Sequence, residues 1–156
     1  MKAIALFVCL LFAGPAFGQM MAAAPFKGAN EIVVTVPDSS GAAYALMARA
    51  FATAGYQLDK ADKELGIVST RPHPAPRLNM LCAYSAMVLP SAKGSVVSIR
   101  GTSSLPGAAG VSPLLTGESV INYRGMSGSP AMVAWEEMAA RLRAAFPSAV
   151  PSYVKR

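Results

Sequence analysis

His73 is the only histidine of the chain and the side chain best suited to act as a base or as a metal ligand. A zinc site needs further Cys, His or carboxylate ligands at defined spacing, and a nucleophilic mechanism needs a nucleophile held beside its base. His73 stands between two prolines and has neither companion nearby. The sequence therefore predicts no catalytic residue, no metal site and no cofactor, and we expect the protein not to be an enzyme.

Two other segments could hold reactive groups, and neither fits a known motif. The run GMSGS at 125–129 resembles the nucleophile elbow of hydrolases, which needs a glycine two places after the serine, and Ser129 stands there instead. The three carboxylates between residues 59 and 64 supply too few oxygens for a calcium loop and alternate with lysines. We interpret the first segment as a helix cap and the second as a solvated turn.

The segment RPHPAPR at 71–77 is the strongest candidate for a contact with another protein. Its alternating prolines favour an extended polyproline conformation, which loses little entropy when it docks. The candidate partner-binding residues are Arg71, His73, Pro74 and Arg77. A second interpretation, a stiff connector between strands, stays open.

The first eighteen residues have the three parts of a signal peptide. Lys2 is followed by the apolar run 3–12, then by a break at Gly14-Pro15 and by small residues up to Gly18. The apolar run is about half of the ~20 residues that a membrane span requires. Cys9 lies within the run and not at its end, so lipoprotein processing is not expected. The sequence predicts cleavage after Gly18 and a periplasmic or secreted protein without a transmembrane segment.

Removal of 18 of the 156 residues leaves 138, the length of one domain. Cys82 is then the only cysteine, which excludes an internal disulfide, and its apolar neighbours predict a buried thiol. The basic residues are scattered and form no run, which argues against nucleic acid as a partner.

Hydrophobic periodicity predicts the elements that carry these residues. Apolar patterning predicts strands at 31–37, 78–89 and 95–102, a hairpin over 56–70, and a short strand at 119–124. A further helical turn across residues 59–65, ended by Gly66, stays open as an alternative to the hairpin. Helical spacing predicts helices over 41–54, ended by Gly55, and from the Ser129-Pro130 cap to residue 146. Residues 38–40 (Asp-Ser-Ser) are the cap candidates of the first helix, and Phe51 and Trp135 are expected on the apolar stripes that the two helices turn to a common layer of strands. Glu137 and Arg141 are expected to face water as a pair one helical turn apart.

These elements predict an α+β fold in which an antiparallel sheet of four to five strands carries two helices on one face. We expect a signal peptide at 1–18, a flexible tether at 19–30, one domain at 31–147 and a loose tail at 148–156. Residues 103–118 are rich in Gly, Ser, Pro and Ala, which is typical of a loop.

A resemblance to a known family adds a functional expectation. Ala54-Gly55-Tyr56 at the end of a helix, the acidic turn with Asp62, and Gly66-Ile67-Val68 leading to Ser69-Thr70 resemble small envelope domains such as the C component of the outer-membrane β-barrel assembly machinery. The resemblance covers residues 31–72 and implies a scaffold or binding role without catalytic residues. Two functions remain open: an envelope protein that binds a partner protein or assembly, or a periplasmic binder of an apolar or lipid ligand between sheet and helices.

Overall fold

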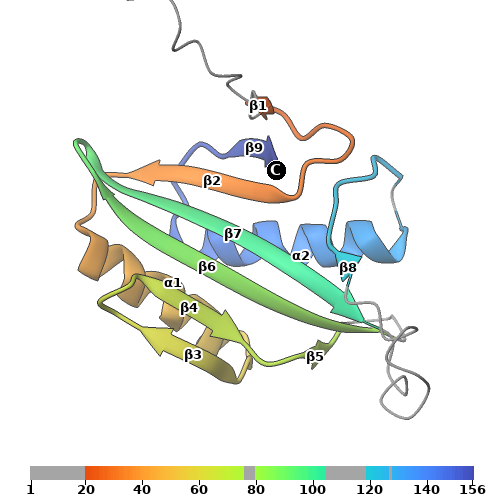
Figure 1. The fold of residues 1–156 in the computed structure, drawn as a ribbon, viewed down its shortest axis with the longest axis horizontal. Helices are drawn as coiled ribbons and strands as arrows, with labels where there is room; N and C mark the ends of the chain where they lie inside the picture. The colour runs from red at the N-terminus through yellow and green to blue at the C-terminus, as the bar shows by residue number, and fades with distance from the viewer. Residues whose placement is uncertain (1–19, 76–79, 105–118, 127) are drawn as a thin grey trace, which may run out of the picture.

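The computed structural model describes residues 20–75, 80–104, 119–126 and 128–156 (Figure 1). The elements are β1 (Met20–Ala22), β2 (Glu31–Val36), α1 (Ser40–Thr53), β3 (Leu58–Asp62), β4 (Ile67–Thr70), β5 (His73–Pro74), β6 (Leu81–Ser91), β7 (Gly94–Ser104), β8 (Ser119–Val120), α2 (Pro130–Ala145) and β9 (Ser152–Lys155). The predicted α+β class is confirmed.

All strands belong to one antiparallel sheet in the order β1-β9-β2-β7-β6-β4-β3, with β5 paired to β6 and β8 paired to β7. Its centre is the long hairpin of β6 and β7, paired from Leu81↔Ser104 to Ser91↔Gly94. The sheet has nine strands, so the expected four to five was too few. The strands that were not predicted, β1, β5 and β9, are two to four residues long, too short for periodicity to reveal them. The predicted short strand at 119–124 is present as β8, over its first two residues.

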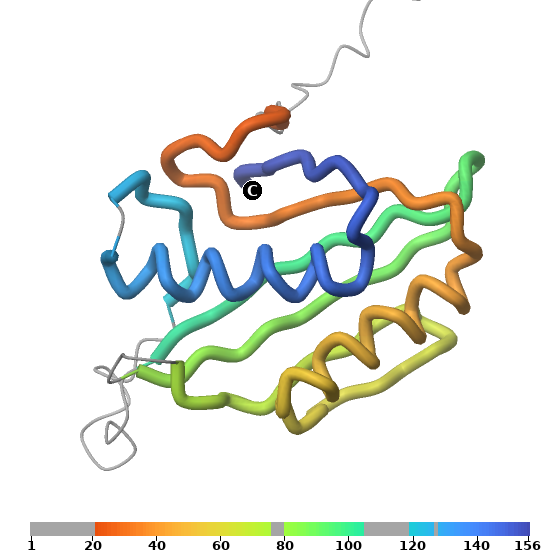
Figure 2. The backbone as a smooth tube through the Cα atoms, turned by 180° about the vertical axis from the view of Figure 1, so that it is seen from behind, coloured from red at the N-terminus to blue at the C-terminus, as the bar shows by residue number. Residues whose placement is uncertain are grey.

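Both helices lie against the same face of the sheet (Figure 2). Serine side chains cap their first turns: Ser39 accepts a hydrogen bond from the Ala42 N–H, and Ser129 accepts one from the Met132 N–H. The predicted cap at Ser129 is therefore confirmed, and of the three candidates at 38–40 the structure uses Ser39. The predicted packing of two helices on one face is confirmed as well.

The core fills the layer between the helices and the sheet. On β2 the even-numbered residues from Ile32 to Val36 are buried against the helices, as their alternation predicted. Phe51 of α1 and Trp135 of α2 are 0% and 3% exposed and belong to one apolar cluster. Burial of an aromatic ring of this size is worth about 3 kcal/mol, so these two side chains contribute strongly to stability.

The expected tether and tail are both wrong in part, because each contributes a strand. Residues 152–155 form β9, which lies between β1 and β2, and its Val154 is 1% exposed. Ala29, expected in the tether, is fully buried. Pairing between segments about 130 residues apart satisfies the backbone of both ends, and local sequence carries no signal for such pairing.

Among the described residues, neither helix is long and apolar enough to cross a membrane.

Candidate functional site

The proline segment is held in place at the end of the sheet. His73 pairs with Cys82 across β5 and β6, and its ring meets Tyr56 edge to face with centroids 5.1 Å apart. Arg71 is exposed, and its Nε lies 3.9 Å from a carboxylate oxygen of Asp59. Pro74 is exposed as well, and Arg77 lies outside the described residues. The described part of this segment thus includes a short strand on the sheet, as a connector between β4 and β6 would, and its partner-binding role stays a prediction.

A network of two tyrosines and a carboxylate beneath α2 was not expected. Glu137 was predicted to face water with Arg141, and this was wrong. Its carboxylate accepts a hydrogen bond from the hydroxyl of Tyr56 and another, at 3.0 Å, from the hydroxyl of Tyr84. The helical period placed Glu137 outside the apolar stripe, but it could not show that two tyrosines from the sheet side reach that flank of the helix.

Burial and the neighbouring charge of Glu137 raise the pKa of Tyr84 and of Tyr56 well above the ordinary tyrosine value. Both hydroxyls therefore stay protonated and act as donors at neutral pH. Burial likewise raises the pKa of the Cys82 thiol, which is 1% exposed. A buried, protonated thiol reacts poorly, so the predicted structural role of Cys82 is consistent with its surroundings.

A second polar cluster, formed by Glu31, Arg100 and Arg156, links the C-terminal residue to the sheet through ion pairs. Glu31 is 1% exposed, and its Oε2 lies 2.6 Å from Nε of Arg156 and 3.1 Å from a guanidinium nitrogen of Arg100. Both arginines are about half exposed, so only the carboxylate is fully buried. Two cations around one buried carboxylate satisfy it and leave a net positive charge at this place.

The face of the sheet opposite the helices carries no element of the described chain (Figure 1). Its central strands show apolar side chains there: Met87 and Leu89 are 42% and 49% exposed, and Leu89 pairs with Val96 of β7. Exposed apolar side chains on adjacent strands form a surface that a partner could cover.

Among the described strands, the edge of β2 that is turned away from β7 is only partly paired. Its pairing with β9 stops at Val33, whereas its pairing with β7 continues to Val36. The carbonyl oxygen of Val36 approaches Gly94 of β7 so closely that no Cβ would fit there. Because backbone groups alternate between the two sides of a strand, the N–H and C=O of Thr35 point away from β7, toward the free edge.

A groove of about 750 Å³ follows this edge. Val33, Thr35 and Val96 border it from the sheet, and Leu46 of α1 borders it from the helical side. The turn after α2 closes it with Phe146, Pro147, Ala149 and Val150. We call this feature the edge groove. It combines an apolar lining with a free strand edge, the two elements from which peptide-binding grooves are built.

A different hollow, of about 670 Å³, lies among cationic side chains near the end of β9. Its lining includes Lys27, Arg124, Lys155 and Arg156. We call it the cationic pocket. Its lining residues come from three segments that are far apart in the sequence, so in the sequence their charges look scattered.

In the part of the chain that the structure describes, no three His, Cys, Asp or Glu side chains gather closely enough to hold a metal ion. Comparison of the sequence with protein-family models and with curated proteins finds no match. The resemblance to envelope assembly domains therefore stays a prediction.

Proposed function

We propose that this is an exported, non-enzymatic protein of the cell envelope that binds a partner protein through the edge groove. The observation that carries the proposal is the backbone of Thr35, which pairs with no described strand on its side away from β7 and lies beside an apolar groove. An extended partner segment could pair with this backbone and place alternate side chains in the groove, as in other complexes formed by strand addition. The proposed export rests on the signal-like residues 1–18.

The exposed apolar side chains of the groove would add to the affinity for such a segment. Val150 is 78% exposed, so an apolar side chain of the partner would remove it from water. Partner binding through the groove requires no catalytic group. Cys82 is buried, and the hydroxyls of Tyr56 and Tyr84 are hydrogen-bonded to Glu137.

The alternative, an apolar ligand held between sheet and helices, has less support. Large side chains such as Phe51, Met47 and Tyr84 fill that layer and are at most 1% exposed. A ligand there would have to displace well-packed groups, at a cost of several kcal/mol.

Site-specific crosslinking tests the proposal. A photo-reactive amino acid replaces Val150 in the groove or, as a matched control, Leu65, which is also exposed but lies in the turn between β3 and β4. We expect one discrete crosslinked product in envelope extracts from position 150 and none from position 65. With the crosslinked partner purified, hydrogen exchange should show new protection of the Thr35 amide. Equal crosslinking at the two positions, or no protection at Thr35, would contradict a groove-directed contact.

A further inference from the structure

The cationic pocket is built by backbone contacts between distant segments. The N–H of Gly28 donates to the carbonyl of Tyr123 at 2.9 Å, and the N–H of Tyr123 donates to the carbonyl of Ala29 at 2.8 Å. The N–H of Asn30 donates to the carbonyl of Val154 at 2.9 Å. These bonds bring together the loop before β2, the segment after β8 and the end of β9. These hydrogen bonds therefore hold the backbone at Lys27, Arg124 and Lys155 in fixed relative positions.

The charge of the pocket is not compensated by its own lining. Among the described residues that line it, four are Lys or Arg and none is Asp or Glu. Arg156 is engaged by Glu31. In the described part of the chain, Lys27, Arg124 and Lys155 have no carboxylate within ion-pair distance, and all three are exposed. Like charges held around one hollow repel each other, and an anion between them relieves the repulsion.

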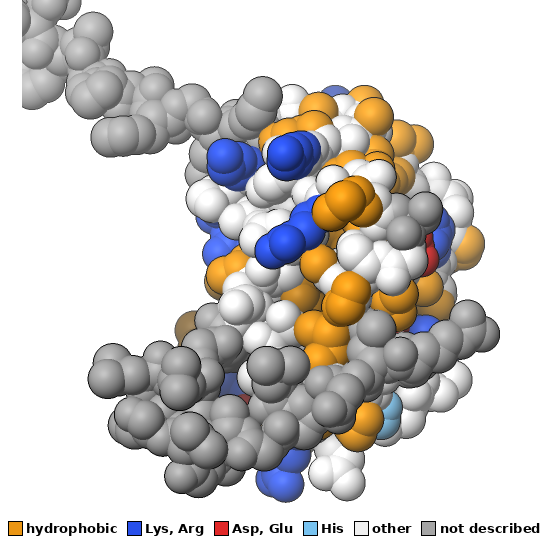
Figure 3. Space-filling view, turned by 90° about the vertical axis from the view of Figure 1, so that its right-hand side faces the viewer, with side chains coloured by type: hydrophobic (Ala, Val, Ile, Leu, Met, Phe, Trp, Pro, Cys, Tyr) orange, Lys and Arg blue, Asp and Glu red, His pale blue; other side chains and the backbone are white. Residues whose placement is uncertain are grey.

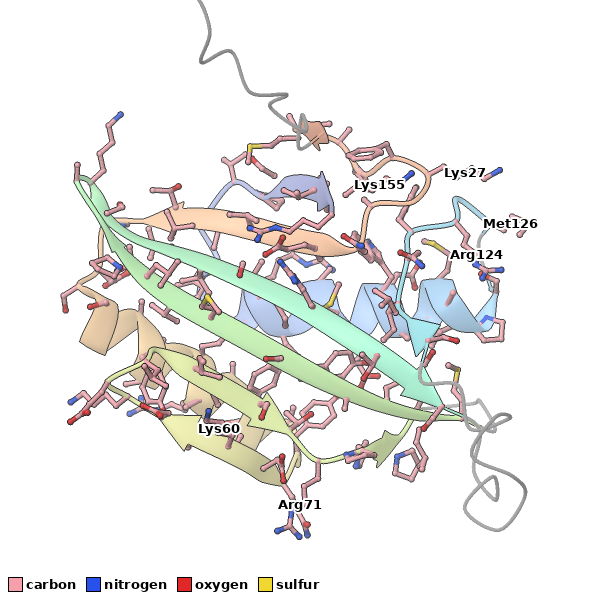
Figure 4. The ribbon with its side chains drawn as sticks, in the orientation of Figure 1. Lys27, Lys60, Arg71, Arg124, Met126 and Lys155 are labelled. Carbon is pink, nitrogen blue, oxygen red and sulfur yellow. The ribbon has the colours of Figure 1, made fainter. Side chains whose placement is uncertain are left out.

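Exposed apolar side chains stand beside these cations. Met126 is 62% exposed and Val120 is 49% exposed, and both line the same pocket. Seen from this end of the molecule, Lys and Arg side chains gather next to hydrophobic ones (Figure 3). Lys27, Arg124, Met126 and Lys155 lie at one corner of the molecule, far from Lys60 and Arg71 (Figure 4).

We propose that this corner docks on the surface of an anionic lipid bilayer. The cations would contact lipid phosphates, and Met126 and Val120 would enter the interface between headgroups and acyl chains. Basic side chains close to an anionic membrane each strengthen binding by about fivefold, and partial insertion of apolar side chains adds to this. An acidic protein could satisfy the cations, but it would not by itself account for exposed Met126 and Val120 at the same corner.

This inference goes beyond the proposed function, because the two surfaces are separate. The edge groove and the cationic pocket share no lining residue. Loss of membrane docking would leave partner binding in place, and the reverse also holds. A protein with both surfaces would present its partner at a membrane.

Vesicle co-sedimentation tests the inference with the whole protein. Vesicles of phosphatidylcholine with about one third phosphatidylglycerol are compared with phosphatidylcholine alone, at low and at high salt. The test variant is the double substitution Lys27→Glu, Lys155→Glu. The matched control is Lys60→Glu, Arg71→Glu, which changes the net charge equally at the other end of the molecule. All four positions are exposed, and thermal unfolding confirms that each variant folds. Wild type and variants carry the same N-terminus, so any contribution of residues 1–19 cancels.

We expect the wild type to bind anionic vesicles and to be released by salt. The test variant should bind at least about 25-fold more weakly, since two cations contribute about fivefold each, whereas the control should change by less than about threefold. Met126→Ser should weaken binding about threefold and leave the salt dependence intact. Equal binding to both kinds of vesicle would overturn the inference, as would equal loss in the two double variants. Binding of polyglutamate but not of vesicles, lost in the test variant, would assign the pocket to an acidic protein instead.

Discussion

Alkaline pH should destabilise this protein through Tyr84. The side chain is 1% exposed, and its hydroxyl donates to Glu137 at 3.0 Å. Burial and the charge of Glu137 raise the pKa of Tyr84 above its ordinary value of 10. In the unfolded chain the same hydroxyl ionises near that ordinary value, so the unfolded state loses its proton first. The contribution of the neutral Tyr84 hydroxyl to the free energy of unfolding is therefore complete below pH 10, and it is lost as the pH rises above 10.

The expected loss of stability follows from the number of protons that the unfolded chain releases and the folded protein keeps. One tyrosine that is neutral when folded and ionised when unfolded lowers the free energy of unfolding by about 1.4 kcal/mol for each pH unit above 10. The pKa of Tyr56 is raised by burial and by Glu137 as well, so Tyr56 adds to the slope in the same direction. The loss should be small at pH 9.5 and several times larger at pH 11.5.

Urea unfolding between pH 8.5 and pH 11.5, followed by the fluorescence of Trp135, the only tryptophan, measures this slope. Tyr84→Phe should make the slope shallower by about 1.4 kcal/mol per pH unit. Val88→Ala, which removes buried methyl groups from the same strand, should lower stability at every pH and keep the wild-type slope. If Tyr84→Phe and the wild type show equal slopes above pH 10, the account of a buried neutral hydroxyl is refuted.

Two further predictions concern stability and can be measured by the same unfolding assay at neutral pH. Glu31→Gln removes the buried charge that two guanidinium groups share, and it should cost about 2 kcal/mol; the loss would be absent if this ion cluster were of no importance to the sheet. Gly94→Ala should cost about 3 kcal/mol, because φ is +120° and the new Cβ would meet the backbone of β2. Gly55→Ala is its control: φ is +84° with no atom within 4 Å of the Cβ, so the cost should be about 1 kcal/mol, and equal costs would contradict the steric argument.

Local signals were sufficient for the elements that carry strong periodicity or caps. The three cap candidates at 38–40, of which the structure uses Ser39, and the cap residue Ser129 marked the starts of the helices. The alternation of Ile32, Val34 and Val36 marked the buried face of β2. The strand pattern was too weak to identify β9, because only four residues pair and Pro151 stands directly before them. β9 lies between β1 and β2, and a segment with so weak a pattern of its own becomes a strand only through pairing with such neighbours.

The candidate surfaces could be foreseen only to a small extent. The proline segment was named from its composition, and local sequence gave no sign that His73 and Pro74 pair with β6. Its role in partner binding stays a prediction. The edge groove depends on where β9 stops pairing with β2, which is a matter of register. Glu137 was assigned to solvent because the helical period shows only which side of α2 is apolar, and not which hydroxyls lie beside that side.

The two helices, the antiparallel strands between them and the shared apolar layer around Phe51 and Trp135 could be derived from the amino-acid sequence, because they follow from contacts close along the chain and from the period of apolar residues. That Lys27, Arg124 and Lys155 surround one pocket, and that Thr35 lies where β2 has no described neighbour beside β9, became visible only in the folded molecule. Local charge and backbone exposure at these places depend on which distant segments pair, and the burial of apolar side chains across the whole sheet selects that pairing.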